Sequence, residues 1–148
     1  MNLDFFKQTR ILDGGMGQEL LARGMKPNGT LWSANALLKD EYHQLLLDTH
    51  LDFIKSGAEI IVTTTFTTRR LRLRDNNIED KFEYLNTKAG EIAKKAKELN
   101  PHVLIAGGLP PQYLTYEADT RTNNEIKENF YDQAKLLNPF IDFFYFDV

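Results

Sequence analysis

The hydrophobic positions of the chain fall into four short apolar runs, separated by longer stretches with a helical period. The runs are RILD at 10–13, EIIVTTT at 59–65, VLIAG at 103–107 and IDFFYFDV at 141–148. The second and third runs are continuous and show no alternation, which is typical of parallel strands covered on both faces. The pattern therefore predicts four buried parallel strands.

The stretches between these runs predict helices. Apolar residues recur at three- and four-residue steps over 79–99, and the Asn100-Pro101 pair that follows ends a helix. Further helices are predicted over 16–23, 40–55 and 124–137. Alternating strands and helices give a parallel sheet with crossover helices. We therefore expect an α/β fold in a single domain that spans 1–148.

The composition narrows the classes of function. The 148 residues include 18 Lys and Arg and 21 Asp and Glu, and the net charge of −3 argues against a nucleic-acid binder. No apolar run approaches the roughly 18 residues of a membrane span, and the first ten residues do not form a signal peptide. We therefore expect a soluble, cytoplasmic protein without nucleic-acid or membrane partners. The absence of cysteine excludes a disulfide, a cysteine nucleophile and a thiolate metal site built from this chain alone.

Candidate functional residues follow the predicted strands, because ligands of parallel α/β folds bind beyond the carboxyl ends of the strands. Asp13 follows the first strand, and Asp147 closes the fourth. Two carboxylates at one mouth hold a substrate ammonium group or bind a divalent cation such as magnesium. The alternatives are a turn before glycines for Asp13 and a frayed terminus for Asp147. Other candidates at this mouth are Gly14, Gly15, Thr64, Thr65 and Phe66.

Further features of the sequence leave alternatives open. Gly14–Gly17 opens a helix as a phosphate loop does, but it lacks the third glycine of the dinucleotide fingerprint. Four arginines within 69–74 either bind a carboxylate or phosphate or form a solvated face, and the acidic residues behind them favour the solvated face. Trp32 either covers a ligand or plugs one end of the fold. A packed or surface role is expected for His43, His50 and His102.

Taken together, the strand-end motifs resemble those of the homocysteine S-methyltransferase family. ILDGGMGQEL at 11–20 is similar to the family's opening strand motif, and LWSA at 31–34 to the segment after it. HLDFIKSGAEII and TTTF within 50–66 resemble the next strand and its approach. AGGLP at 106–110 and IDFFYFD at 141–147 are similar to the third and fourth strand motifs, although the family usually has Glu at the position of Asp147. The resemblance covers essentially the whole chain.

The resemblance implies the first half of a TIM (β/α)₈ barrel, four βα-type units that end at the fourth strand. It also implies that Asp13 and Asp147 hold the amino group of homocysteine. Gly14 and Gly15 would let the backbone approach the ligand closely, and the pocket wall would consist of Thr64, Thr65 and Phe66. In the family, three later cysteines bind zinc, which keeps the substrate sulfur as a thiolate that attacks a methyl group on a cationic donor. None of these cysteines occurs in this chain.

We therefore expect the amino-acid-binding half of a methyltransferase that makes methionine, with zinc as the cofactor of the full barrel. Methyl transfer is not expected from this chain alone, which would be a truncated product or one piece of a split barrel completed by a C-terminal half. The alternative is a non-catalytic half-barrel that self-associates or binds an amino acid, because the apolar run at 141–148 has no helix after it to cover it. A third hypothesis is a magnesium enzyme that uses Asp13 and Asp147.

Overall fold

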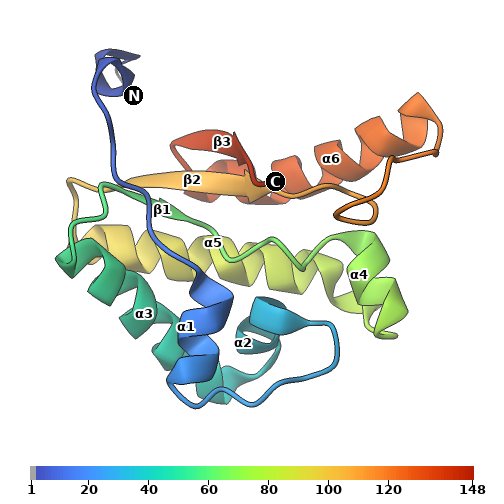
Figure 1. Cartoon of the computed structure of the whole chain (residues 1–148), viewed down its shortest axis with the longest axis horizontal. Coiled ribbons are helices and arrows are strands. Elements are labelled where there is room, and N and C mark those ends of the chain that lie inside the picture. Colours follow the sequence, from blue (N-terminus) through green and yellow to red (C-terminus); the bar gives the residue numbers. More distant parts are fainter. Residues whose placement is uncertain (1–2) are drawn as a thin grey trace.

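The computed structural model describes residues 3–148 as a parallel sheet with helices packed against it (Figure 1). Strands β1 (Ile60–Val62), β2 (Leu104–Leu109) and β3 (Phe143–Phe146) lie side by side in that order. Three residue pairs join β1 to β2 and four join β2 to β3, all in parallel register. The predicted α/β class with parallel strands and crossover helices is confirmed.

Six α-helices occur in the described part of the chain. The predicted helix over 40–55 begins with a 3-10 turn at Asp40–Tyr42, and that over 79–99 with a 3-10 turn at Glu79–Lys81. Two short helices, α2 and α4, were not predicted because four and six residues are too few to show a helical period. The six helices are α1 (Met16–Ala22), α2 (Asn35–Leu38), α3 (His43–Lys55), α4 (Arg70–Asp75), α5 (Phe82–Leu99) and α6 (Asn123–Leu137).

The predicted strand over 10–13 is not a regular strand, so this part of the prediction is wrong. Leu12 alone forms a parallel bridge to Ile60, and the Ile11 carbonyl accepts from the N–H groups of Glu59 and Ile60. Among residues 3–148 no strand pairs with the other edge of the segment, and one bridge does not make a ladder. The segment nevertheless runs beside β1, in the position where a fourth strand of the sheet would lie.

Strand β1 is shorter than the predicted run at 59–65, because beyond Val62 threonine hydroxyls form hydrogen bonds to β2 in place of the backbone ladder. Thr65 Oγ1 donates to the Gly108 carbonyl at 2.6 Å, and Thr63 Oγ1 accepts from the Gly108 N–H at 2.9 Å. These side-chain bonds tie the end of β1 to β2 where the backbone ladder stops. Strand β3 is likewise shorter than the predicted run at 141–148. Just before it, the Asp142 side chain accepts a hydrogen bond from the Ile105 N–H.

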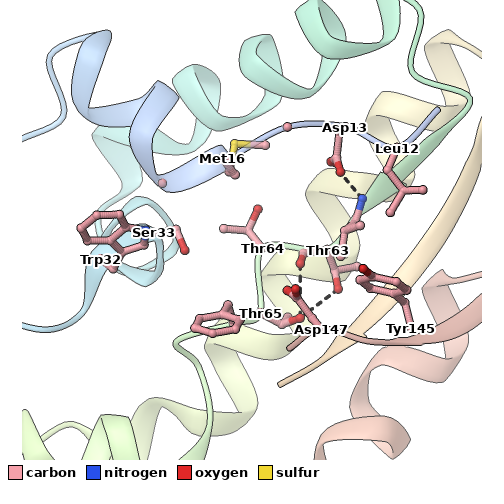
Figure 2. A pocket seen from close by; sticks show the side chains of 15 residues that line it. Leu12, Asp13, Met16, Trp32, Ser33, Thr63, Thr64, Thr65, Tyr145 and Asp147 are labelled. Atoms are coloured by element: carbon pink, nitrogen blue, oxygen red, sulfur yellow. Dashed lines mark hydrogen bonds between the residues drawn. The ribbon is translucent and has the colours of Figure 1, made fainter. Parts of the chain in front are cut away.

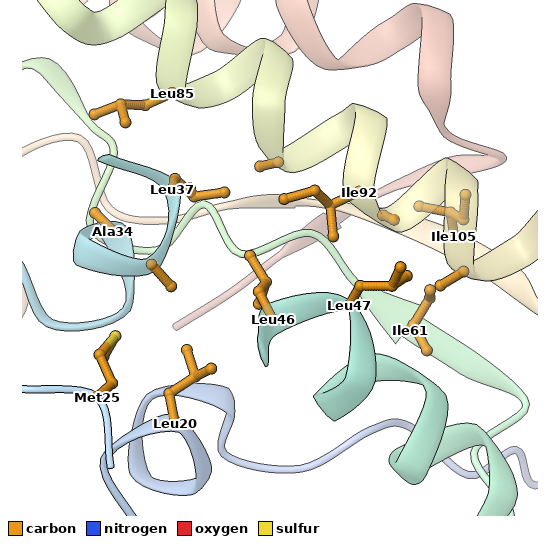
Figure 3. Packing of buried hydrophobic residues seen from close by; sticks show 14 of the residues in the cluster. Leu20, Met25, Ala34, Leu37, Leu46, Leu47, Ile61, Leu85, Ile92 and Ile105 are labelled. Carbon is orange, nitrogen blue, oxygen red and sulfur yellow. The ribbon is translucent and has the colours of Figure 1, made fainter. Parts of the chain in front are cut away.

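The hydrophobic core lies between one face of the sheet and helices α1, α2, α3 and α5 (Figure 3). Fully buried apolar side chains in this core come from each of these elements, among them Leu20, Leu37, Leu46, Ile61, Leu85 and Ile105. Burial of each such side chain stabilises the fold by about 1.5–3 kcal/mol. Apolar side chains near the edges of the sheet are instead exposed to solvent. The exposed fraction is 58% for Ile11, 68% for Phe146 and 95% for Val148. No helix within residues 3–148 is long and apolar enough to cross a membrane.

The four arginines of 69–74 do not form the solvated face that the sequence favoured. Arg69, just before α4, is only 1% exposed and donates to the carbonyl of Phe66. Arg70 pairs with Asp132 on α6, with 2.7 Å between Nη2 and Oδ2. The charge pattern failed as a guide because α4 turns part of the run toward the interior.

A buried polar cluster holds the segment after β1 against two helices. Gln133 of α6 donates to the Thr65 carbonyl at 3.2 Å and to Asn86 Oδ1 at 3.0 Å, and it accepts from Gln112 Nε2 at 2.7 Å. Thr68 Oγ1 also donates to Asn86 Oδ1 at 2.7 Å. Gln133 and Asn86 are both fully buried, so their partners have no water to replace a lost bond. The cluster therefore sets the position of residues 64–66, which follow β1.

Replacing Gln133 by Met tests this cluster. Met has a similar volume but removes one of the two acceptors of Gln112 Nε2 and the donor to the Thr65 carbonyl and Asn86 Oδ1, so we expect the free energy of unfolding to fall by about 1–3 kcal/mol. Urea denaturation followed by circular dichroism measures the change. Gln44→Met on the exposed side of α3 is the matched control and should change stability by less than about 0.5 kcal/mol. Equal effects of the two substitutions would show that the buried cluster does not stabilise the fold.

Candidate functional site

A cavity of about 300 Å³ opens at the carboxyl ends of segment 10–13, β1 and β3 (Figure 2). Every candidate site residue predicted from the sequence lines this cavity. These residues come from three parts of the chain that are far apart in sequence, and parallel strands place their ends at one edge. They are Asp13, Gly14, Gly15, Thr64, Thr65, Phe66 and Asp147. Their roles toward a ligand remain predictions.

The carboxylate of Asp13 is nearly inaccessible, with 5% of its side chain exposed. Its Oδ2 atom accepts a hydrogen bond from the Val62 N–H at 2.9 Å, which fastens the end of segment 10–13 to β1. The pKa of Asp13 is raised to about 7, mainly by burial and to a smaller extent by the negative charge of Asp147, against the opposing effect of the bond from Val62. Asp13 therefore exchanges its proton near neutral pH, and a cation in the cavity would favour the charged form.

Asp147 lies across the cavity from Met16 and Trp32, as Figure 2 shows. Its N–H donates to the Leu109 carbonyl at 3.1 Å, which attaches the residue to the end of β2. Burial raises the pKa of this carboxyl as well. No lysine or arginine within residues 3–148 pairs with Asp13 or Asp147, so the cavity holds two carboxylates without a cation. An ammonium group bound between them would satisfy both.

His50 lies directly behind Asp13. The imidazole is fully buried, Nδ1 is 3.9 Å from Asp13 Oδ2, and neither ring nitrogen has a hydrogen-bond partner. Burial lowers the pKa of His50 to about 4, so the ring is neutral at pH 7 and does not supply the missing cation. The packed role expected from the sequence is found. Its place beside Asp13 was missed, because helical spacing does not show which strand end a helix face meets.

The threonines after β1 have different roles in the cavity wall. The hydroxyl of Thr65 is used in the bond to Gly108, whereas Thr64 Oγ1 is buried and has no partner. Thr64 therefore offers a free hydroxyl to a ligand at this wall. The backbone at Gly15 borders open space, while a side chain at Gly14 would collide with the ring of Phe53. Gly15 therefore allows close approach of a ligand, and Gly14 is needed for packing.

Several other residues of this wall were not predicted from the sequence. Tyr145 and Met16 line the cavity together with Ser33, which is buried. The position of Tyr145 in this wall could have been predicted from strand alternation, because it lies two residues before Asp147 and side chains of a strand alternate between faces. Ser33 has no comparable signal, because it comes from an irregular connection.

The residues present do not fit a zinc centre. The chain has no cysteine, and residues 3–148 contain no cluster of three or more His, Asp or Glu able to hold a metal ion. Zinc that activates a substrate sulfur needs three protein ligands and one open position. Magnesium prefers six oxygen ligands, of which Asp13 and Asp147 would supply a minority. The site therefore has the chemistry to hold an ammonium group and lacks the ligands for a structured metal centre.

The raised pKa of Asp13 predicts how stability depends on pH. The folded chain keeps this proton up to about pH 7, whereas the unfolded chain releases it near 3.8, so Asp13 makes the free energy of unfolding fall as pH rises between these values. Buried His50, whose pKa is lowered to about 4, makes it rise between about pH 4 and pH 6.5, so the contribution of Asp13 is read from the difference between wild type and variant. Asp13→Asn keeps the acceptor for Val62 and removes the titrating proton, so in urea denaturation its stability relative to wild type should increase from about pH 4.5 to about pH 8, by about 1.4 kcal/mol per pKa unit. Asp48→Asn on the exposed side of α3 should stay parallel to the wild-type curve, and an Asp13→Asn curve parallel to wild type would contradict the assignment.

Comparison with known proteins adds an independent line of evidence. Residues 10–148 match the family model described as homocysteine S-methyltransferase. The homocysteine S-methyltransferase of Escherichia coli K12 is 32% identical over 117 residues, which cover 74% of this chain and 37% of the relative. Homocysteine S-methyltransferase 2 of Zea mays is 36% identical over 90 residues, covering 60% of this chain and 26% of the relative. The matched segments thus cover well under half the length of these two curated relatives.

The solved structures agree with the sequence comparison. The metallated form of the homocysteine methyltransferase MmuM from Escherichia coli superposes with a TM-score of 0.79 at 27% identity. The match covers 95% of this chain and 54% of that protein. The family model covers almost the whole chain, and the fold of a solved member covers it as well. The chain therefore belongs to the homocysteine S-methyltransferase family.

Proposed function

We propose that this chain binds homocysteine and forms the amino-acid-binding part of a homocysteine S-methyltransferase. The observation that carries the proposal is the buried carboxylate of Asp13 and the half-buried carboxylate of Asp147, which face one cavity without a lysine or arginine partner within residues 3–148. The ammonium group of an α-amino acid supplies the missing positive charge and three hydrogen-bond donors. Family membership supports homocysteine as the amino acid.

In this proposal, binding of the ammonium group is coupled to the loss of a proton from Asp13. The carboxylic acid form of Asp13 prevails below about pH 7, and only the carboxylate attracts the substrate cation strongly. The free hydroxyl of Thr64 and the open backbone at Gly15 are then placed to contact the rest of the amino acid. Together these groups orient the substrate at the carboxyl edge of the sheet.

The second substrate is a methyl donor with a positively charged methyl-bearing group. Trp32 and Phe66 line the cavity, and aromatic faces attract such cations by about 0.5–2 kcal/mol. Zinc, where three thiolates hold it, activates the sulfur of a bound thiol at neutral pH. Since this chain has no cysteine, we propose that those ligands belong to a C-terminal half of the barrel that lies outside residues 1–148.

We also propose that the sheet is the first half of a TIM barrel. Segment 10–13, β1, β2 and β3 are parallel neighbours in chain order, as successive strands of such a barrel are. The match to about half of the solved relative supports this arrangement. A C-terminal half would then pair with the free edges of segment 10–13 and β3.

Recognition of the amino group is the direct test of the proposed function. Homocysteine should bind about 10–100-fold more tightly than 4-mercaptobutanoic acid, which lacks only the amino group, because the charge-assisted bonds to Asp13 and Asp147 are lost. Calorimetric titration at pH 8 measures both affinities, and homocysteine affinity should rise between pH 6 and pH 8 as Asp13 ionises. Asp13→Asn should abolish the preference, whereas Asp48→Asn should preserve it. Equal affinity of the wild-type chain for the two ligands would refute the proposal.

The exposed apolar edge of the sheet favours self-association as the second candidate function. Phe144 is 41% exposed, Phe146 68% and Val148 95%, although Phe146 also contacts the ring of Phe130 at 6.0 Å between centroids. Two copies related by a two-fold axis would cover these side chains.

Light scattering of the purified chain separates the two candidates. The methyltransferase proposal expects a monomer that forms a 1:1 complex with a C-terminal half containing the three family cysteines. Phe146→Lys should leave the size of the free chain unchanged and weaken that complex, because it places a charge on the free edge of β3. A compact dimer of the wild-type chain that Phe146→Lys converts to monomer would instead support the self-associating half-barrel.

A further inference from the structure

The arginines of the segment 69–74 divide into two kinds. Arg70 pairs with Asp132, and Arg74 donates to both carboxylate oxygens of Glu79 at 2.8 and 2.9 Å. Arg69 and Arg72 form no ion pair with any acidic side chain within residues 3–148. Asp75, at the end of α4, forms no ion pair within residues 3–148 but raises the pKa of Arg69 through its charge, so Arg69 and Arg72 have no paired carboxylate there.

Arg69 is a cation in the interior that forms no ion pair with an acidic side chain of residues 3–148. Only 1% of the residue is exposed, and its guanidinium donates to the Phe66 carbonyl at 2.9 Å and to Thr115 Oγ1 at 3.1 Å, with Nε unpartnered. Burial and the charge of Arg72 lower the pKa of Arg69 to about 10 against the opposing charge of Asp75, so the group stays protonated at pH 7. A buried cation whose direct partners are two neutral acceptors produces a positive potential in its surroundings.

Arg72 faces a second cavity of about 390 Å³, which adjoins the site of Asp13. Its Nε atom is buried and has no partner. Trp32 and Phe66 line this cavity and also the cavity that contains Asp13 and Asp147. The two aromatic side chains therefore form a wall shared by an acidic cavity on one side and a basic cavity on the other.

The shared wall is held in place by the surrounding structure. Trp32 has a φ of 51°, a left-handed conformation that costs about 1 kcal/mol or more for a residue other than glycine. Thr67 Oγ1 fixes it by donating to the Leu31 carbonyl at 2.6 Å and accepting from the Ala34 N–H at 3.2 Å. A side chain at Gly17 would overlap the indole, so the ring fits only against a bare backbone. Trp32 is thus positioned at the boundary of the two cavities.

We propose that the cavity at Arg72 is a carboxylate subsite that holds the acidic end of the methyl donor. The cationic, methyl-bearing group of the donor lies against Trp32 and Phe66, and its carboxylate accepts from the guanidinium of Arg72, with the charge of Arg69 behind it. A carboxylate suits this place better than a phosphate dianion, because Asp13 and Asp147 lie on the other side of the wall. The identity of the ligand as a methyl donor rests on the proposed function.

Glycine betaine and choline test the subsite in the intact chain. Both carry a trimethylammonium group, but only betaine carries a carboxylate. Trp32 is the only tryptophan and lines both cavities, so its fluorescence reports binding. At matched ionic strength, betaine should bind about 10–100-fold more tightly than choline. Inorganic phosphate should not compete with betaine.

Substitution of the arginines assigns the effect to Arg72. Arg72→Gln should reduce the betaine preference to within about twofold, and Arg72→Lys should retain part of it. Arg74→Gln is the matched control on α4, since Arg74 pairs with Glu79, and it should preserve the preference. Equal binding of betaine and choline by the wild-type chain, an unchanged preference in Arg72→Gln, or displacement of betaine by phosphate would each overturn the carboxylate subsite.

The test of the carboxylate subsite can fail independently of the test of amino-group recognition. Amino-group recognition at Asp13 without discrimination between betaine and choline would reject the subsite and leave homocysteine binding standing. Arg72-dependent betaine binding without amino-group recognition would support the carboxylate subsite and remove its assignment to a methyl donor.

Discussion

The site depends on the burial of the Asp13 carboxylate against the N–H of Val62. This bond of 2.9 Å adds to the backbone bonds that join the irregular segment 10–13 to β1, and it places the carboxylate at the edge where Asp147 also lies. Keeping a charge there is costly in the absence of a cation, as the rise of the Asp13 pKa to about 7 indicates. A ligand with an ammonium group would remove this cost, because its positive charge would stabilise the carboxylate form of Asp13. The proposed recognition of an amino acid therefore rests on how the first two extended segments pack.

Much of the fold and site could be predicted from the sequence, because parallel strands leave simple signals. Continuous apolar runs marked β1 and β2, and Asp13 and Asp147 were found because they follow apolar runs. The segment 10–13 was predicted as a strand and is not one, since pairing depends on a neighbour that a local pattern does not reveal. The buried environments of His50 and Arg69 could not be predicted from the sequence either. Burial of a polar side chain depends on which elements meet around it, and neither spacing nor charge runs specify this.

The charges of the candidate site are arranged in two regions on either side of the wall of Trp32 and Phe66. Acidic groups border one cavity and Arg72 borders the other. The buried cluster of Gln133, Asn86 and Thr68 fixes the segment after β1 and so the position of Phe66. This part of the fold can thus position small polar molecules without contributing a metal centre. Membership of the homocysteine S-methyltransferase family fits this division, in which the proposed amino-acid site lies in this chain and cysteine thiolates are absent from it.

The most direct measurement of this account is methionine formation by the purified chain supplied with homocysteine, S-methylmethionine and zinc. The account predicts that homocysteine binds while methionine forms no faster than in buffer with zinc alone, because the chain has no thiolate to hold the metal. Methionine formation above that background, abolished by a chelator, would show that these residues complete the catalytic centre and would contradict the account.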